Sequence, residues 1–256
     1  MKSLVGKIAL VTGGSQGIGL ATVQALLAEN ATVITCGRSL DKWKLAVTQN
    51  PALRVVDFQA VDLTQSSELQ AWFASVRQTY DRLDIAVNNF ASNERGIGEF
   101  AKLSEAKINA AMHAGLLAPL ACLREEISLM QQDARGGAIV NVSSINGLRA
   151  TPGAAVYSAA KHGIEGITKS LALEVIGQGI RINAVAPGVT LTPSWEARLA
   201  AAESPSAMKA SVEQIVPLKR FASADEIANA IMWLCSDAAS YVVGHTLVVD
   251  GGLSQA

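Results

Sequence analysis

The sequence predicts an α/β protein built on a parallel β-sheet covered by helices. Seven short runs are rich in Val and Ile, and most of them lack apolar–polar alternation, which is typical of strands buried on both faces. Longer segments between them repeat apolar residues at helical spacing. Strand–helix alternation of this kind indicates parallel strands joined by crossover helices.

The predicted strands follow one another along the whole chain. They are KIALVT (7–12), ATVITC (31–36), LRVVDF (53–58), LDIAVNN (83–89), GAIVNVS (137–143), IRINAVA (180–186) and HTLVVDG (245–251). Two of the intervening helices are predicted at IGLATVQALLAEN (18–30) and SELQAWFASVRQTY (67–80). No repeat, low-complexity segment or linker interrupts the pattern, so we expect one domain over residues 1–256.

The composition favours a soluble, cytoplasmic protein. Half of the 256 residues are apolar, 17% are charged and the net charge is −1, with no Lys/Arg run that would indicate a nucleic-acid partner. The N-terminal apolar run is too short for a signal peptide, and the longest apolar stretch, AGLLAPLACL (114–123), covers about half a membrane span. Cys36, Cys122 and Cys235 form no CxxC pair and are expected to be reduced core residues, and the histidines show no metal-ligand spacing.

The first predicted strand leads into a glycine-rich turn, TGGSQGIG (12–19). Gly13, Gly17 and Gly19 let the backbone turn tightly and approach a ligand, and the following helix offers free N–H groups to a pyrophosphate. A glycine-rich turn without a ligand is the alternative, but the position between strand and helix favours dinucleotide binding. The residues predicted to contact the cofactor here are Gly13, Ser15, Gln16, Gly17, Ile18 and Gly19.

The end of the second predicted strand indicates which dinucleotide binds. A carboxylate that binds the ribose hydroxyls often stands roughly 20 residues after the glycines. Here Arg38 and Ser39 occupy that region, and no acid follows until Asp41. Arginine suits a 2′-phosphate, so we expect NADP(H) to be favoured, with NAD(H) as the alternative and a solvated loop arginine as the plainest interpretation.

Two further segments lie at carboxyl ends of predicted strands, where open α/β sheets bind ligands. In VDLT (61–64), Asp62 is expected to accept a hydrogen bond from the adenine amino group, with the Leu63 N–H beside it; a helix cap is the alternative. In VNN (87–89), Asn88 and Asn89 end the fourth predicted strand.

A tyrosine, a lysine and a serine are predicted to converge. Tyr157 and Lys161 lie one turn apart on a predicted helix, and Ser144 follows the fifth predicted strand at its carboxyl end. A free tyrosine has a pKa near 10, and a neighbouring ammonium lowers it. We therefore expect Tyr157 to exchange a proton with a substrate oxygen, Lys161 to tune it and Ser144 to hydrogen-bond the same oxygen. The alternatives are a surface pair of Lys161 with Glu165 and an ordinary half-buried tyrosine.

Taken together, these motifs make the sequence resemble the short-chain dehydrogenase/reductase family over essentially the whole chain, including its 3-oxoacyl-reductase-like members. The motifs are TGGSQGIG, VDLT, VNN, NVSS, YSAAK, NAVAPGVTLT and the segment from Arg220 to Gly252. The resemblance implies a single-domain, doubly wound Rossmann-like fold with a seven-stranded parallel sheet. It also implies hydride transfer between a nicotinamide and an alcohol or carbonyl carbon.

The resemblance also assigns site residues. It implies that Ser144, Tyr157 and Lys161 are catalytic and that Lys161 also holds the nicotinamide ribose. It places Asn89 by the ribose and Asp62 and Leu63 at the adenine. The residues it places at the nicotinamide end are Pro187, Gly188, Val189 and Thr192.

The chain departs from the family pattern at two positions. Asn-Asn-Ala-Gly is common after the fourth strand, whereas this chain has Phe90 and Ala91 after the two asparagines. Gly115 stands where the family carries an asparagine at a helix kink, which helps to hold a water linked to the lysine. We hypothesise that proton transfer between Lys161 and solvent is slower or follows another route, while the hydride step is intact.

Substrate and assembly are less determined. The segment at about 193–215 is expected to be a substrate lid, with Trp195 and Met208 lining a pocket or simply packing the lid against the body. The small residues Ala159, Ala160 and Gly163 permit close helix packing, and the resemblance implies a homotetramer. The leading hypothesis is an NADP(H)-dependent oxidoreductase acting on a secondary alcohol or ketone; the alternatives are a cofactor-binding protein with little turnover and an NAD-linked alcohol dehydrogenase.

Overall fold

The computed structural model describes residues 4–90, 94–132 and 135–256. Its strands form one parallel sheet in the order β3-β2-β1-β4-β5-β6-β7, which confirms the predicted doubly wound α/β fold. The strands are β1 (Ile8–Thr12), β2 (Thr32–Gly37), β3 (Asp57–Ala60), β4 (Ile85–Asn88), β5 (Gly137–Val142), β6 (Ile180–Pro187) and β7 (Thr246–Val249).

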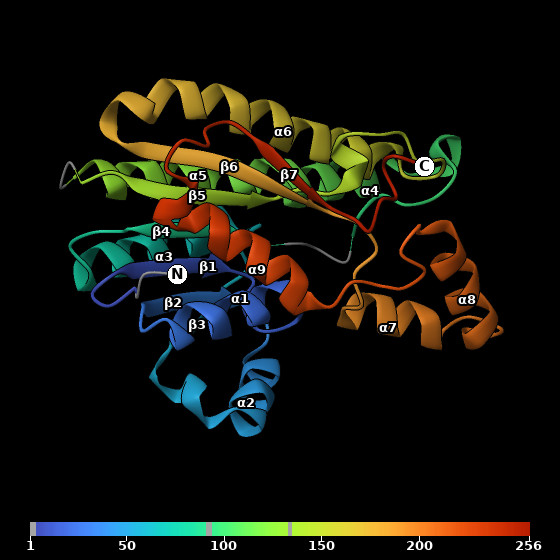
Figure 1. Cartoon of the computed structure of the whole chain (residues 1–256), viewed down its shortest axis with the longest axis horizontal. Coiled ribbons are helices and arrows are strands. Elements are labelled where there is room, and N and C mark those ends of the chain that lie inside the picture. The colour runs from blue at the N-terminus through green and yellow to red at the C-terminus, as the bar shows by residue number, and fades with distance from the viewer. Residues whose placement is uncertain (1–3, 91–93, 133–134) are drawn as a thin grey trace.

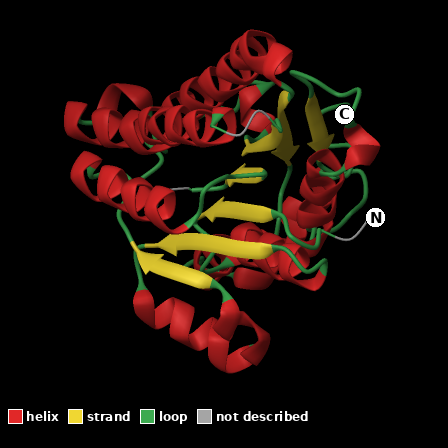
Figure 2. Cartoon of the chain, turned by 90° about the vertical axis from the view of Figure 1, so that its left-hand side faces the viewer, coloured by secondary structure: helices red, strands yellow, loops and turns green. Residues whose placement is uncertain are grey.

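Helices cover the sheet on both faces (Figures 1 and 2). The α-helices are α1 (Gly17–Ala28), α2 (Leu40–Gln49), α3 (Ser66–Thr79), α4 (Glu105–Met112), α5 (Ala118–Gln131), α6 (Ala155–Val175), α7 (Pro193–Ala200), α8 (Pro205–Ile215) and α9 (Ala224–Cys235). Within β1, Ala9 and Val11 pack with α1, α2 and α9, whereas Leu10 packs with α3, α5 and α6. Successive side chains of a strand point to opposite faces, so the sheet carries a core on each side.

The third predicted strand was placed too early. Residues Pro51–Val55 form a short 3-10 helix, and β3 begins only at Asp57. The Asn50 side chain caps that helix by accepting from the Ala52 N–H, and Pro51 fixes its first turn. Leu53 is apolar because it packs into the core from a helical turn, not because it lies in a strand.

The predicted kink near Gly115 takes the form of a π-helical turn. The segment His113–Leu117 is π-helical and joins α4 to α5. A Cβ atom at Gly115 would lie 2.9 Å from the Cβ of Ala160 on α6, closer than carbon atoms normally approach. The absence of a side chain therefore lets this turn pack directly on the helix that carries Tyr157 and Lys161.

The combined helical run Glu105–Gln131 is long and apolar enough to cross a membrane by length and composition. One third of that window is buried inside the protein, and a core helix of a soluble protein passes the same test. No other helix in the described part of the chain meets these criteria.

Two of the small residues noted on α6 pack within the chain. Ala160 is buried against Gly115, and a Cβ at Gly163 would lie 2.7 Å from the side chain of Leu116. Ala159 is exposed. Close packing thus joins α6 to the π-helical turn of the same molecule, while the homotetramer stays a prediction.

A chain of polar side chains crosses the core between β4, β5, α5 and α6. Asn88 donates to Glu126 (2.8 Å) and to Asn141 (3.1 Å), and Asn141 donates to Thr168 (2.9 Å). All four side chains are buried. Asn88, although it ends β4, therefore points into the core and not toward the ligand edge of the sheet.

Candidate active site

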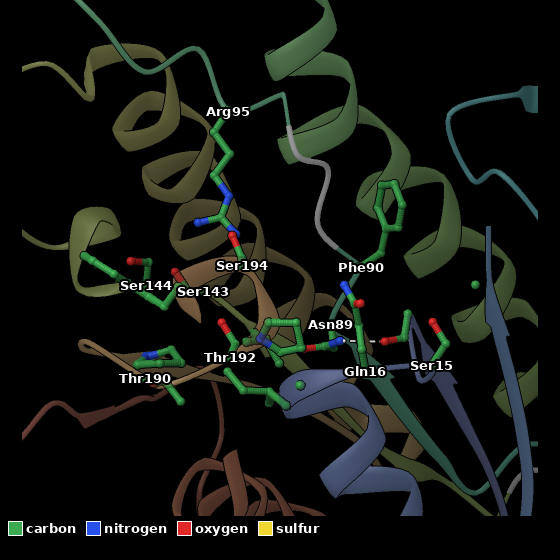
Figure 3. Close-up of a pocket in the computed structure, with 18 of the residues that line it drawn as sticks. Ser15, Gln16, Asn89, Phe90, Arg95, Ser143, Ser144, Thr190, Thr192 and Ser194 are labelled. Atoms are coloured by element: carbon green, nitrogen blue, oxygen red, sulfur yellow. Dashed lines mark hydrogen bonds between the residues drawn. The ribbon is translucent and has the colours of Figure 1, made fainter. Parts of the chain in front are cut away.

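The carboxyl ends of the strands open into a cleft of about 420 Å³ that runs from the β1–α1 turn to α6. Most predicted site residues line it, as the close-up in Figure 3 shows for the labelled ones. The predicted residues that line it are Gly13, Ser15, Gln16, Gly17, Ile18, Arg38, Ser39, Asn89, Ser144, Tyr157, Lys161, Pro187, Gly188 and Thr192. Gly19, Asp62, Leu63 and Val189 are not among the lining residues.

The glycine turn is shaped for an anionic ligand. Gly13 and Gly17 have φ of +71° and +57°, a region that residues with a Cβ rarely adopt. A Cβ at Gly19 would lie 2.2 Å from the carbonyl oxygen of Gly13, so only glycine permits this close approach. No acidic side chain occupies the first turn of α1 and no side chain caps it, so its N–H groups are open to a pyrophosphate.

Asn89, which directly follows β4, stabilises this turn by hydrogen bonds. Its Nδ2 donates to the carbonyl oxygens of Gly13 (3.1 Å) and Thr12 (3.3 Å). The backbone N–H groups of Asn89 and Phe90 both donate to the hydroxyl of Thr12, each at 3.1 Å. Phe90, the large residue at the family's alanine position, also lines the cleft. Ala91 lies outside the described residues.

The end of the cleft beside the start of α2 is basic. Arg38 and Lys42 both line it, and no acidic side chain does among the residues that the structure describes. Ser39 accepts a hydrogen bond from the Lys42 N–H and so caps α2, which places Lys42 in the first turn beside Arg38. Lys42 was not among the residues predicted from the sequence. The available signal was Ser39, a residue type that often caps a helix, because a cap there places Lys42 in the first helical turn, near Arg38.

Asp62 makes local contacts in the described structure. Its carboxylate accepts from the N–H (3.0 Å) and the hydroxyl (2.8 Å) of Thr64, and its own N–H donates to Glu68. Leu63 is a core residue. These contacts form a local turn with Thr64, and the N-cap of α3 is Gln65 without a side-chain cap, so Asp62 is not the helix cap of the alternative; adenine contact stays a prediction.

The opposite end of the cleft, beside α6, brings Tyr157, Lys161 and Ser144 together. Lys161 Nζ lies 5.9 Å from the centre of the Tyr157 ring and donates to the carbonyl oxygen of Val142 at 2.9 Å. Burial lowers the pKa of Lys161, and Arg95 lowers it further, while Tyr157 and Glu165 act in the opposite direction. Ser144, just after β5, accepts from the Asn146 N–H at 3.2 Å, which fixes its hydroxyl at the cleft wall.

Two more polar residues at this end were not predicted from the sequence. The guanidinium carbon of Arg95 lies 5.6 Å from the centre of the Tyr157 ring. Ser143 is buried, lines the cleft, and its hydroxyl has no hydrogen-bond partner among the described residues. Arg95 comes from an irregular loop after β4, where no periodicity indicates which way a side chain points.

Comparisons with known proteins agree with this geometry. A family model described as enoyl-(acyl carrier protein) reductase matches residues 13–254. A short-chain dehydrogenase/reductase, astE, of Aspergillus oryzae is 38% identical, with 98% of this chain and 96% of the relative covered. The 3-oxoacyl-[acyl-carrier-protein] reductase FabG of Thermotoga maritima is 34% identical, with 98% of each chain covered.

The chain belongs to the short-chain dehydrogenase/reductase family. It is therefore an oxidoreductase that acts on CH–OH or carbonyl groups with NAD or NADP. Among solved structures, a variant of actinorhodin polyketide ketoreductase with NADPH superposes with a TM-score of 0.90 at 30% identity, covering 98% of each chain. The fold and the family predicted from the sequence are confirmed.

Proposed function

We propose that the protein is an NADP(H)-dependent oxidoreductase that transfers hydride between the nicotinamide and a secondary alcohol or ketone, with Tyr157 as general acid/base. One observation carries the proposal: Tyr157, Lys161 and Ser144 line the same cleft as the glycine turn. A dinucleotide held at the N-terminus of α1 reaches toward this group from the other end of the cleft. The names of the relatives, which include 3-oxoacyl-[acyl-carrier-protein] reductases, support a carbonyl substrate.

The chemistry divides between cofactor and protein. When bound, NADPH supplies the hydride that reaches the carbonyl carbon. Tyr157 donates its phenolic proton to the carbonyl oxygen, and Ser144 donates a hydrogen bond to that oxygen. The Lys161 ammonium stabilises the tyrosinate that remains, and its bond to the Val142 carbonyl keeps it in place. In the oxidative direction the same groups take the proton from the alcohol.

The choice of NADP(H) rests on charge at the adenosine end. Arg38 and Lys42 supply two cations where a 2′-phosphate would lie, with no acid among the described lining residues to repel it.

The lid proposal rests on α7 and α8, which follow Thr192; α7 contributes Trp195 to the cleft wall. Met208 is not a lining residue, so Trp195 is the better candidate for contact with substrate.

A turnover panel tests the function. Purified protein is given NADPH or NADH with ketones, quinones, sugars and 3-oxoacyl thioesters, and reduced-cofactor absorbance is followed. We expect turnover that is lost in Tyr157→Phe while NADPH binding is kept. Tight NADPH binding without turnover on any substrate would favour the cofactor-binding protein with little turnover.

A second pair of variants tests the cofactor. Arg38→Glu should weaken NADPH binding far more than NADH binding, because it removes one cation and adds an anion beside the 2′-phosphate. Lys42→Met should show the same preference with a smaller loss. Equal losses for both cofactors in Arg38→Glu would contradict the NADP(H) assignment and favour the NAD-linked alternative.

A further inference from the structure

Arg95 spans the reactive end of the cleft. It comes from the loop after β4, and its guanidinium reaches the hydroxyl of Ser194 at the start of α7, with Nη2 to Oγ at 3.4 Å. The same guanidinium lies over the Tyr157 ring, 5.6 Å from its centre. Figure 3 shows the side chain extending from its loop into the space between Ser143 and Ser144 on one side and Asn89 and Phe90 on the other.

This cation has no carboxylate partner in the described part of the chain. Its recorded contacts are the Ser194 hydroxyl and the Tyr157 ring, and no Asp or Glu lines the cleft among the described residues. Among the described residues that line the cleft at this end, the Lys161 ammonium is the other charged group and is also positive. An arginine keeps its proton in proteins, so this partly exposed guanidinium attracts an anion that enters the cleft.

The cofactor does not supply this anion in the proposed arrangement. The pyrophosphate belongs to the glycine turn at the N-terminus of α1, and the 2′-phosphate to Arg38 and Lys42. Arg95 instead lies beside the tyrosine that holds the reacting oxygen. The tyrosinate that Tyr157 leaves forms only during the reaction and is stabilised by the Lys161 ammonium, so an anion that is present when the substrate binds would be carried by the substrate, a few bonds from the carbonyl carbon.

We propose that Arg95 is a specificity-determining residue that binds a substrate carboxylate, so that the preferred substrates are short oxo acids and the corresponding hydroxy acids. The proposal rests on the proposed function and names the substrate class for the same site. The guanidinium presents paired N–H donors that match a carboxylate, and the Ser194 hydroxyl beside it offers one more. A 3-oxoacyl thioester carries no anion next to its ketone, so it lacks this contact.

Matched substrate pairs test the proposal. The probes are 2-oxobutanoate, 3-oxobutanoate and 4-oxopentanoate, each beside its methyl ester, which keeps the ketone and removes the charge. We expect wild type to prefer one or more acids over their esters. Arg95→Met should lower kcat/KM for the preferred acid by about 10- to 100-fold, mainly through KM, and leave the ester within about threefold, as loss of a charged hydrogen bond requires.

Two further variants show whether the effect comes from the positive charge at position 95, from the shape of the arginine side chain or from the net charge of the protein. Arg95→Lys keeps the cation and should recover part of the preference for the acid. Arg77→Met removes a positive charge from α3, where Arg77 pairs with Glu125 outside the cleft, and should leave the acid-to-ester ratio unchanged. Equal loss on acid and ester in Arg95→Met, or a wild type that prefers every ester, would overturn the proposal.

A binding measurement distinguishes this proposal from the proposed function. Trp195 lines the cleft, so its fluorescence can follow acid and ester titrated into the protein–NADP⁺ complex. Acid binding that is lost in Arg95→Met supports the carboxylate site even where turnover fails. If NADPH affinity falls in Arg95→Met as much as acid affinity, Arg95 serves the cofactor and the proposal is wrong.

Discussion

Glu126 should make the stability of the protein depend on pH. The carboxyl is fully buried on α5; Oε2 accepts from Asn88 at 2.8 Å, while Oε1 has no partner among the described residues. Burial raises the pKa of Glu126 from 4.5 to about 8, although the Asn88 bond opposes the shift. The folded protein therefore keeps the carboxyl protonated over a range in which the unfolded chain ionises.

The sign and size of the effect follow from linkage. Because the folded pKa is raised, the unfolded state releases a proton first, and the free energy of unfolding falls as pH rises from 4.5 toward about 8. At about 1.4 kcal/mol per pH unit, the full interval corresponds to about 5 kcal/mol. The contribution of Glu126 to the free energy of unfolding is fully present below pH 4.5, and it no longer changes with pH above about 8.

The test is Glu126→Gln, which cannot ionise. Urea unfolding is followed by tryptophan fluorescence at pH 5, 6, 7 and 8 for variant and wild type. The new amide changes the free energy of unfolding by an amount that does not depend on pH. The free energy of unfolding of the variant relative to wild type should therefore rise by about 4 kcal/mol from pH 5 to 8. Glu125→Gln, whose partner Arg77 lies at the surface, is the control. A difference between Glu126→Gln and wild type that stays constant with pH would refute the reasoning.

Substitutions at two further positions, Asp84 and Gly115, test the remaining inferences. Asp84 accepts a hydrogen bond from the first N–H of β1 and pairs with Lys7 and Arg82. Burial raises the pKa of Asp84, but these partners together lower it. Asp84→Asn should therefore lower the free energy of unfolding by about 3 kcal/mol at neutral pH, measured by thermal unfolding, and the difference from wild type should shrink as pH falls below 4. Gly115→Asn and Gly115→Ala both press a Cβ against Ala160 and should each cost about 1–3 kcal/mol. Only the asparagine restores the amide, so turnover by Gly115→Asn should exceed that of Gly115→Ala; equal rates and pH profiles would show that the amide has no part in the proton relay.

The parts of the site that sequence could predict are those fixed by local geometry. The glycine turn is such a case, because Gly17 needs a positive φ and Gly19 a close approach that no other residue permits. Tyr157 and Lys161 are another, because helical spacing alone places them on one face. Ser144 was predictable from its place at the end of a buried strand, since parallel strands share one ligand edge.

The parts that could not be predicted depend on how separate elements meet. Arg95 lies in a loop without periodicity, and its orientation depends on Ser194, which is 99 residues away in the chain. Asp62 illustrates the opposite difficulty, because an acid at a strand end suits both a ligand and the local turn with Thr64 that the structure shows. The apolar run at Leu53 favours a strand although it forms a 3-10 helix, because the sequence pattern of buried residues is alike in a short strand and in a helical turn.

The helices that follow β6 have a consequence for how this scaffold can be altered. Neither α7 nor α8 contains a fully buried residue, whereas Lys161, Ser143 and the strand ends beneath them are buried. The proposed lid is therefore attached to the folded core by few buried contacts, whereas Arg95, the proposed carboxylate contact, lies outside it. Grafting the 193–215 segment of a relative onto this chain should change which groups are accepted around the Arg95 contact while leaving the reaction, the cofactor and the folded core as they are.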